Sequence, residues 1–190
     1  MGTAMRNRNI EVEDLPRYTL SDWEQWEGKW ELIDGIPFAL SPMPDKKHQR
    51  INGRLYIQFS DQLEDCPDCE AFLPVNYKIN DVNLLHPDLL VVCGEDEDGT
   101  YITNTPGLVA EILSVSTKTK DKKTKLKLYQ ALGIRYYIII APKTETVSVF
   151  ELNGAGEYEL KANGRNISYQ FEFGECKTTV DFSRIWKGKP

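Results

Sequence analysis

In the sequence His-Pro-Asp-Leu-Leu-Val-Val (residues 86–92), one acidic residue, Asp88, opens an apolar run. The later stretch Leu-Val-Ala-Glu-Ile-Leu-Ser (108–114) has a single acid, Glu111, among apolar neighbours. Short runs of Leu, Val and Ile bounded by Pro or Gly predict buried strands. Burying an unpaired carboxylate is costly, and two carboxylates about 4 Å apart repel by roughly 4 kcal/mol at an effective dielectric of about 20. We therefore expect a positive group between Asp88 and Glu111, either a divalent cation or a lysine.

The segments after Glu111 predict how the two strands are connected to the rest of the fold. Apolar residues spaced three apart predict a helix at residues 120–132 that ends at Gly133. The nearly apolar run at residues 134–141 predicts a central strand with both faces covered. The order strand, strand, helix, strand implies a crossover connection in a mixed sheet between helices, which is an α/β architecture.

The amino-terminal part is predicted to add a helix and a β-hairpin to this core. A capping-box spacing predicts a short helix at residues 21–27. Asp34-Gly35 is a strong hairpin signal between strands at residues 29–33 and 36–40. Asp45 is predicted to cap a long helix ending near residue 63, because four apolar side chains recur there every four residues: Ile51, Leu55, Phe59 and Leu63.

Further segments are predicted from alternation and turn residues. Residues 73–79 alternate and predict a half-buried strand, which turns back at Asn80-Asp81 to pair with one strand at residues 84–92. A hairpin is predicted around residues 153–156. The segment 180–186 is predicted to be a short helix or strand that covers the sheet.

Length and composition favour one domain. The 190 residues are 41% hydrophobic, which predicts a single domain at residues 18–190 after a flexible arm at residues 1–17. The net charge of −6 means that any site for a polyanion has to be a local basic patch. No run of about 18 apolar residues occurs and residues 1–11 are polar, so we expect a cytoplasmic protein with no membrane association.

The four cysteines are Cys66, Cys69, Cys93 and Cys176. Four cysteines in a chain of this length do not predict a disulfide framework, and a reducing compartment would keep them as thiols. The Cys-Pro-Asp-Cys sequence has the spacing of half a zinc site, but the other two cysteines form no second close pair, so a loop is favoured.

A lysine-rich segment lies in an otherwise acidic chain, with Lys118, Lys120, Lys122, Lys123, Lys125 and Lys127 in ten residues. A solvated helix face explains such a run, and contact with nucleic-acid phosphates is the alternative. Asp121, Lys125 and Tyr129 follow one line on a helix, and Tyr129 also belongs to the apolar stripe, so Lys125 is predicted to lean toward the protein body. His48 in the first turn of its helix is a second candidate for ligand contact, although a solvated histidine is the favoured interpretation.

Glu31 is a candidate third carboxylate. It shares a strand face with Ile33, an apolar neighbour, so it is a candidate ligand for a metal site. The alternative is a half-exposed position on an edge strand.

Taken together, several of these motifs carry a resemblance to a known family. They are Pro87-Asp88, Glu111-Ile112-Leu113-Ser114, Asp121-x-x-x-Lys125-x-x-x-Tyr129, Gly133, Tyr136-Tyr137, Trp30-Glu31-Leu32-Ile33-Asp34-Gly35 and His48-Gln49. The pattern, which covers residues 18–152, resembles the Uma2 (Uma-two) family of restriction-endonuclease-like proteins, a branch of the PD-(D/E)xK nuclease superfamily.

The resemblance implies a restriction-endonuclease-like α/β/α core and hydrolysis of DNA phosphodiester bonds. It implies that Asp88 and Glu111 hold Mg²⁺ (or Mn²⁺), with Glu31 available to complete the metal sphere. The superfamily places a lysine two residues past the second acid, where this chain has Leu113. Lys125 is the candidate replacement, because a long side chain on the following helix can reach back to the strand end. Contacts with backbone phosphates are expected from Lys118, Lys120, Lys122, Lys123 and His48.

Two further interpretations remain open on the sequence. The chain could be a catalytically inactive nuclease fold that binds nucleic acid or a protein partner, as the leucine at position 113 and the acidic composition favour. It could also be a structural protein in which Glu111 and Lys125 form a buried ion pair. A homodimer is an expectation from analogy with related nucleases.

Overall fold

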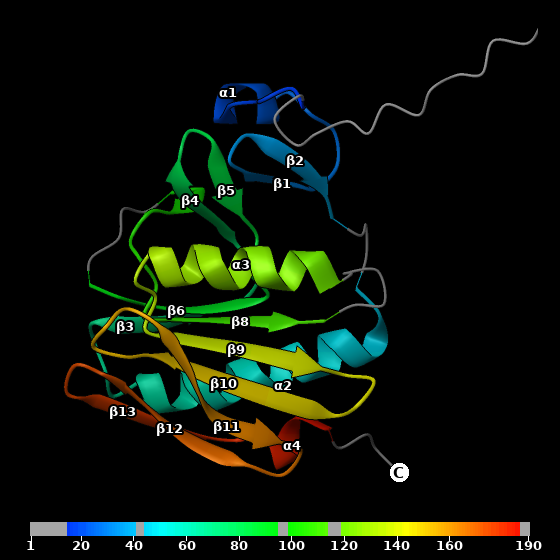
Figure 1. Cartoon of the computed structure of the whole chain (residues 1–190). Coiled ribbons are helices and arrows are strands. Elements are labelled where there is room, and N and C mark those ends of the chain that lie inside the picture. Colours follow the sequence, from blue (N-terminus) through cyan, green and yellow to red (C-terminus); the bar gives the residue numbers. More distant parts are fainter. Residues whose placement is uncertain (1–14, 41–43, 95–98, 114–118, 187–190) are drawn as a thin grey trace, which may run out of the picture.

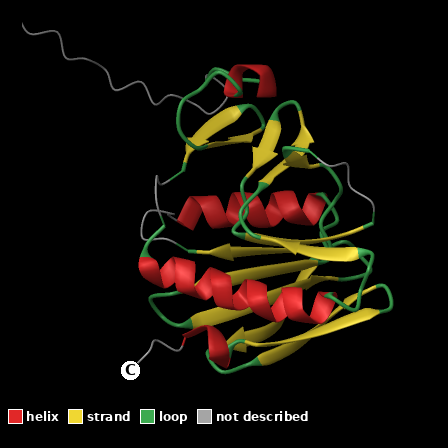
Figure 2. Cartoon of the chain, turned by 180° about the vertical axis from the view of Figure 1, so that it is seen from behind, coloured by secondary structure: helices red, strands yellow, loops and turns green. Residues whose placement is uncertain are grey.

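The computed structural model describes residues 15–40, 44–94, 99–113 and 119–186, with the side chains of residues 119–123 left out. A six-stranded sheet lies at the centre of the molecule, with helix α2 (Lys46–Leu63) on one face and helix α3 (Thr119–Ala131) on the other (Figures 1 and 2). A second, five-stranded sheet lies on the far side of α3 (Figure 1). In the described part of the chain, no helix is long and apolar enough to cross a membrane.

The six-stranded sheet has the order β11-β10-β9-β8-β6-β3. Its strands are β3 (Cys69–Phe72), β6 (Leu89–Cys93), β8 (Leu108–Ile112), β9 (Tyr136–Ala141), β10 (Thr146–Leu152) and β11 (Tyr158–Gly164). Strands β8 and β9 are parallel and joined through α3, whereas the other neighbouring pairs are antiparallel. The mixed sheet and the crossover predicted from the sequence are therefore confirmed.

The five-stranded sheet has the order β2-β1-β5-β4-β7. Its strands are β1 (Trp30–Ile33), β2 (Ile36–Ala39), β4 (Asn76–Asn80), β5 (Asn83–Leu85) and β7 (Tyr101–Ile102). The predicted hairpin at Asp34-Gly35 is confirmed, with both residues at positive φ (51° and 74°). The predicted single strand at residues 84–92 is wrong, because the chain leaves one sheet after β5 and enters the other at β6. Pro87 lies at the break, where it has no N–H to donate to a ladder.

Each face of the central sheet has its own core. Alternate residues of β8 point to opposite faces, so that Leu108, Ala110 and Ile112 pack in the core that includes α2. Val109 packs in the core beneath α3, which also contains residues of the five-stranded sheet. The predicted stripe on α2 is buried in full, and Asp45 caps that helix by accepting a hydrogen bond from the His48 amide at 2.8 Å.

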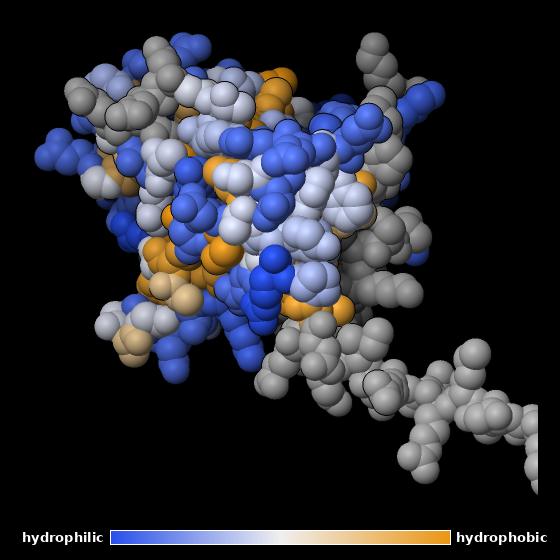
Figure 3. All heavy atoms as spheres, turned by 90° about the horizontal axis from the view of Figure 1, so that it is seen from above, coloured by the Kyte–Doolittle hydropathy of each residue, from blue (hydrophilic) through white to orange (hydrophobic). Residues whose placement is uncertain are grey.

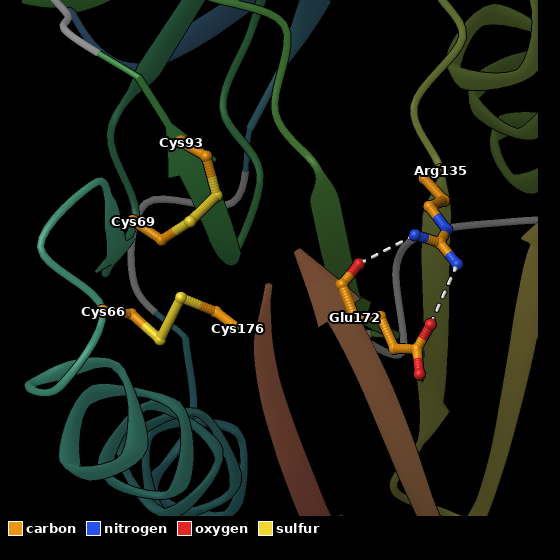
Figure 4. Close-up of a disulfide and its surroundings, with 6 residues drawn as sticks. All are labelled: Cys66, Cys69, Cys93, Arg135, Glu172 and Cys176. Atoms are coloured by element: carbon orange, nitrogen blue, oxygen red, sulfur yellow. Dashed lines mark hydrogen bonds and ion pairs between the residues drawn. A yellow bond between two sulfur atoms is a disulfide. The ribbon is translucent and has the colours of Figure 1, made fainter. Parts of the chain in front are cut away.

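The two ends of the described chain depart from the sequence prediction. Helix α1 spans Leu20–Trp23, and its capping box uses Thr19 and Asp22 instead of a serine at position 21. At the other end, β12 (Ser168–Phe173) and β13 (Cys176–Asp181) form an unpredicted hairpin, followed by helix α4 (Ser183–Trp186). Arg135 beside β9 fixes the hairpin by donating a hydrogen bond to the Glu172 carbonyl at 3.0 Å (Figure 4).

The prediction of free thiols is wrong in this structure. Cys66 forms a disulfide with Cys176, and Cys69 forms one with Cys93 (Figure 4). The pairs are 110 and 24 residues apart in sequence, so only the folded topology brings them together. The first disulfide joins the loop after α2 to β13, and the second joins the paired strands β3 and β6.

Candidate active site

Asp88 lies at the start of β6, where the chain crosses from one sheet to the other. Its Oδ2 accepts a hydrogen bond from the Ile112 amide at 2.7 Å, and its backbone carbonyl accepts one from Asn52 of α2 at 2.8 Å. Leu89 is paired with Ala110 in the antiparallel ladder, so continuing that register by one residue sets Asp88 beside Glu111. Besides burial, the charge of Asp88 also contributes to the raised pKa of Glu111, as expected for two carboxylates at short range. The two acids predicted from sequence are therefore neighbours.

Glu111 is held by two groups from the inner side of α3. Its Oε1 accepts a hydrogen bond from Lys125 Nζ at 2.9 Å and another from the Tyr129 hydroxyl at 2.8 Å. Lys125 and Tyr129 are one helical turn apart, which places both side chains on the same side of α3. The sequence placed Tyr129 in line with Lys125 and in the apolar stripe, but its hydroxyl contact with Glu111 was not predicted.

Lys125 lies between two glutamates. Its Nζ is 2.8 Å from Glu31 Oε1 as well as 2.9 Å from Glu111 Oε1. Glu31 also accepts a hydrogen bond from the His86 amide at 2.8 Å. Only 1% of Glu31 is exposed, and β1 lies between β2 and β5, so the half-exposed edge position considered for Glu31 is wrong. The positive group was expected between Asp88 and Glu111, but the structure places the lysine between Glu31 and Glu111, and Asp88 contacts His48 instead.

The cluster holds three carboxylates and two groups that can carry positive charge. Glu31 and Glu111 share the ammonium group of Lys125, whereas Asp88 pairs with the imidazole of His48. Burial raises the pKa of Glu111 to about 7, the Lys125 charge opposes the shift, and Asp88 and Glu31 add to it. Burial by itself lowers the pKa of Lys125, but Glu111 and Glu31 outweigh it and the pKa lies above its usual value. The raised pKa means that the surroundings of Glu111 disfavour its charged form.

The cluster could bind a hard divalent cation only if water or substrate oxygens supplied the remaining ligands. Among the described residues, no three His, Cys, Asp or Glu side chains are placed to hold a metal ion by themselves. Magnesium in phosphoryl-transfer sites is usually bound by one or two carboxylates together with water and substrate phosphates. Asp88 and Glu111 meet that smaller requirement, since both are carboxylates at the same strand ends and remain partly exposed.

His48 contacts the site, so its favoured interpretation as a solvated helix-face residue is wrong. Its side chain is only 11% exposed, and its Nε2 lies 3.2 Å from Asp88 Oδ1. Burial lowers the pKa of His48, but the hydrogen bond and the charge of Asp88 outweigh burial and raise it. The Nδ1 atom is buried and has no hydrogen-bond partner in the part of the chain that the structure describes.

The lysine-rich segment is described only in part. Lys118 lies outside the described residues, as do the side chains of Lys120, Lys122 and Lys123, so their predicted phosphate contacts stay a prediction. Lys127 is exposed and lines an open cavity of about 350 Å³ together with Ile33, Asp34, Thr124 and Leu128. The cavity lies between α3 and the β1–β2 turn, and none of the three carboxylates lines it.

Three comparisons show which known proteins this chain resembles in sequence and in fold. The sequence profile of the Uma2 family, described as "Putative restriction endonuclease", matches residues 12–174. An uncharacterized protein from Synechocystis sp. is 28% identical over 152 residues, which cover 76% of this chain and 79% of that protein. A crystal structure from Anabaena variabilis, described as "a putative nuclease belonging to DUF820", has the same fold with a TM-score of 0.69 and 19% identity, covering 88% of this chain and 97% of that one. The predicted α/β fold and the family resemblance are both confirmed.

Proposed function

The chain belongs to the Uma2 family, and on this premise we propose that it is a metal-dependent endonuclease that hydrolyses DNA phosphodiester bonds with Mg²⁺ or Mn²⁺. The observation that carries the proposal is the cluster of three acids beside the ends of β6 and β8, where Glu31 and Glu111 share one lysine and Asp88 pairs with His48. A structural ion pair alone would need only one carboxylate for Lys125. The additional acids are accounted for by a second cation that binds with the substrate.

Asp88 and Glu111 would supply the protein oxygens for that cation. When bound, Mg²⁺ lowers the pKa of a coordinated water and neutralises charge that develops on the scissile phosphate. The Ile112 amide and His48 hold the two oxygens of the Asp88 carboxylate, so this ligand is oriented before the metal arrives. Glu31 remains available to complete the metal sphere, although in this structure it holds Lys125.

Lys125 is proposed to supply the positive charge that Leu113 cannot supply. The leucine side chain has no donor and no charge, whereas the ammonium of Lys125 is fixed by Glu31 and Glu111 within reach of the strand ends. A positioned cation stabilises the charge that accumulates on the phosphate oxygens in the transition state. Lys118, Lys120, Lys122 and Lys123 are proposed to contact the DNA backbone, which would position the substrate without reading its sequence. The buried His48 is proposed to orient Asp88 instead.

The test is nicking of supercoiled plasmid by the purified full chain with Mg²⁺, with Mn²⁺ and with EDTA. We expect metal-dependent nicking that falls by at least about a hundredfold in Asp88→Asn, as for the loss of one group that organises transition-state charge. The matched control is Lys127→Met, which removes an exposed lysine from the same helix as Lys125. Activity that survives the double substitution Asp88→Asn and Glu111→Gln would exclude this site.

A second candidate function is binding of nucleic acid, or of a protein partner, without cleavage. It is favoured by Leu113 and by the two glutamates that already engage Lys125. This function predicts a salt-sensitive DNA affinity that is the same for the wild type and Asp88→Asn, and no heat on titration with Mg²⁺. For a protein partner, the face over the five-stranded sheet and α1 offers little, because its hydrophobic side chains form small separate groups on a mostly hydrophilic surface (Figure 3).

A further inference from the structure

All four cysteines of the chain lie together at one place, far from the carboxylates. Cys66 follows the carboxyl end of α2, Cys69 begins β3, Cys93 ends β6 and Cys176 begins β13. Figure 4 shows the two disulfides one above the other, with the Cys66–Cys69 loop on one side and β13 on the other. Four separate segments of the fold therefore bring their only thiol groups to a common point.

Short distances within each pair and a tight turn between the pairs bring the four cysteines close together. The Cα atoms of Cys66 and Cys176 are 6.0 Å apart, and those of Cys69 and Cys93 are 4.0 Å apart. The two pairs are joined by a tight turn in which the Cys69 amide donates a hydrogen bond to the Cys66 carbonyl at 3.0 Å. Such a turn keeps its end Cα atoms within about 7 Å. The Gly94 amide also donates to the Asp68 carbonyl at 2.7 Å, which fixes this loop against the end of β6.

We propose that in the reduced protein these four cysteines bind one Zn²⁺ as a tetrathiolate site. Structural zinc is bound tetrahedrally by four cysteine sulfurs at about 2.3 Å, and a pair spaced as Cys-x-x-Cys is a common half of such a site. The other half is supplied by Cys93 and Cys176, which are distant in sequence and adjacent in the fold. Cys66 and Cys69 are buried, and apolar surroundings favour the neutral thiol. A bound Zn²⁺ would favour the thiolate form of both residues instead.

The zinc-bound and disulfide-bonded forms exclude each other. With the sulfurs paired as disulfides, the described residues offer no group of three or more side chains that could hold a metal ion. Reduction of each disulfide by a dithiol takes up two electrons and two protons, and the dithiol is itself oxidised to a disulfide. The four thiols then release four protons as their thiolates bind Zn²⁺. The same four side chains thus cross-link α2, β3, β6 and β13 in either redox state.

The proposed zinc site is independent of the proposed nuclease site. Asp88 stands just before β6 and Cys93 ends that strand, so five residues of extended chain, about 17 Å, separate them. Thiolate sulfurs also select a different class of metal from carboxylate oxygens. The two sites can therefore be tested separately in one protein.

The experiment measures metal content and thiol reactivity of the purified full chain after reduction with a phosphine and exposure to Zn²⁺, followed by desalting. We expect about one Zn²⁺ per reduced chain and none in the chain with both disulfides intact. Replacement of Zn²⁺ by Co²⁺ should give the intense near-ultraviolet absorption of thiolate-to-cobalt charge transfer, which carboxylate ligands do not produce. Glu111→Gln, which alters only the carboxylate cluster, should keep both signals.

Single substitutions distinguish a four-sulfur site from two independent cysteine pairs. Cys66→Ser and Cys93→Ser each remove one member of a different pair, and each should lower the bound zinc below about 0.1 per chain after desalting. Full zinc binding by Cys93→Ser would overturn the proposal. So would a reduced wild-type chain that binds no zinc while all four thiols react with a thiol reagent, a result that needs no variant to fold.

Discussion

On one face of the six-stranded sheet, α2 buries a stripe of apolar side chains, whereas on the other face α3 buries Lys125 between Glu31 and Glu111. Apart from His48 at its first turn, α2 contributes buried and half-buried amide side chains that bind backbone groups. For example, Gln58 accepts a hydrogen bond from the Asp181 amide at 3.0 Å, and Gln62 accepts one from the Thr179 amide at 2.8 Å. These contacts attach α2 to β13 without burying a charge.

The apolar α2 face stabilises the fold, whereas the charged α3 face holds the groups that the proposed chemistry needs. Apolar burial contributes about 25 cal/mol for each Å² removed from water, whereas a buried ion pair rarely contributes net stability because both ions lose hydration. An apolar side chain at position 125 would have filled the α3 face at less cost. The lysine and its carboxylates are therefore better explained by function than by folding.

The largest effect is expected from Lys125→Met. The substitution keeps the length of the side chain and leaves Glu31 and Glu111 buried without their cation, so we expect unfolding free energy to fall by about 3–5 kcal/mol at pH 8. Mg²⁺ should recover part of the loss, because the freed carboxylates attract it more strongly. Chemical denaturation with and without Mg²⁺ measures both effects.

Lys127→Met is the control for that experiment, since Lys127 is exposed two residues away on the same helix. It should change stability by less than about 0.5 kcal/mol. If both variants lose the same unfolding free energy, then the charge of Lys125 beneath α3 does not affect stability. The proposed contrast between the α2 face and the α3 face would then be wrong.

Leu55→Ala tests the α2 face. Leu55 is fully buried in the apolar core, so its truncation should lower unfolding free energy by about 3 kcal/mol through lost burial and an unfilled cavity. Unlike the loss in Lys125→Met, this loss should be independent of pH and of Mg²⁺. A recovery of Leu55→Ala by Mg²⁺ would show that the metal stabilises the fold in general and not the carboxylate cluster.

The order of elements around the central sheet was predictable because it follows from local patterns. Asp34-Gly35 strongly favours a tight hairpin turn. The four-residue repeat from Ile51 to Leu63 predicts a helix with one buried side, independent of the element that packs against it. The break at Pro87 was missed because the apolar residues on both sides of it look like one strand. The β12–β13 hairpin was also missed, although Tyr169, Phe171 and Phe173 alternate with polar residues as a strand requires.

The site residues that stand out in a local sequence motif were predictable. The contacts that depend on how distant segments come together in the fold were not. Asp88 and Glu111 are conspicuous as lone acids in apolar runs, and Lys125 lies in line with Tyr129. The burial of Glu31 depends on the crossing of α3 over β1, and the contact between His48 and Asp88 depends on where α2 begins relative to β6. Neither is encoded in residues close together in the chain, and the same holds for the cysteine pairs.

Apart from the control Lys127→Met, the smallest change in stability is expected from Glu111→Gln, and this change should depend on pH. The folded pKa of Glu111 is about 7, above its ordinary value of 4.5, so the folded state holds this proton more tightly than the unfolded chain. Stability from this group is present below pH 4.5 and is lost as the pH rises toward 7. Glutamine still accepts hydrogen bonds from Lys125 and Tyr129 but carries no charge to titrate. The stability of the variant relative to wild type should therefore rise by about 1–2 kcal/mol between pH 5 and pH 8.

The gain should fall short of the full pKa shift, because in the variant Lys125 can move toward Glu31. Paired denaturation curves at the two pH values measure it, and Leu55→Ala is the matched variant that should show no such trend. If Glu111→Gln instead loses about 3–5 kcal/mol at both pH values, then Glu111 and Lys125 are a structural ion pair and nothing more. In that case the α3 face would stabilise the fold just as the α2 face does, and the surplus carboxylates would need an explanation other than metal binding.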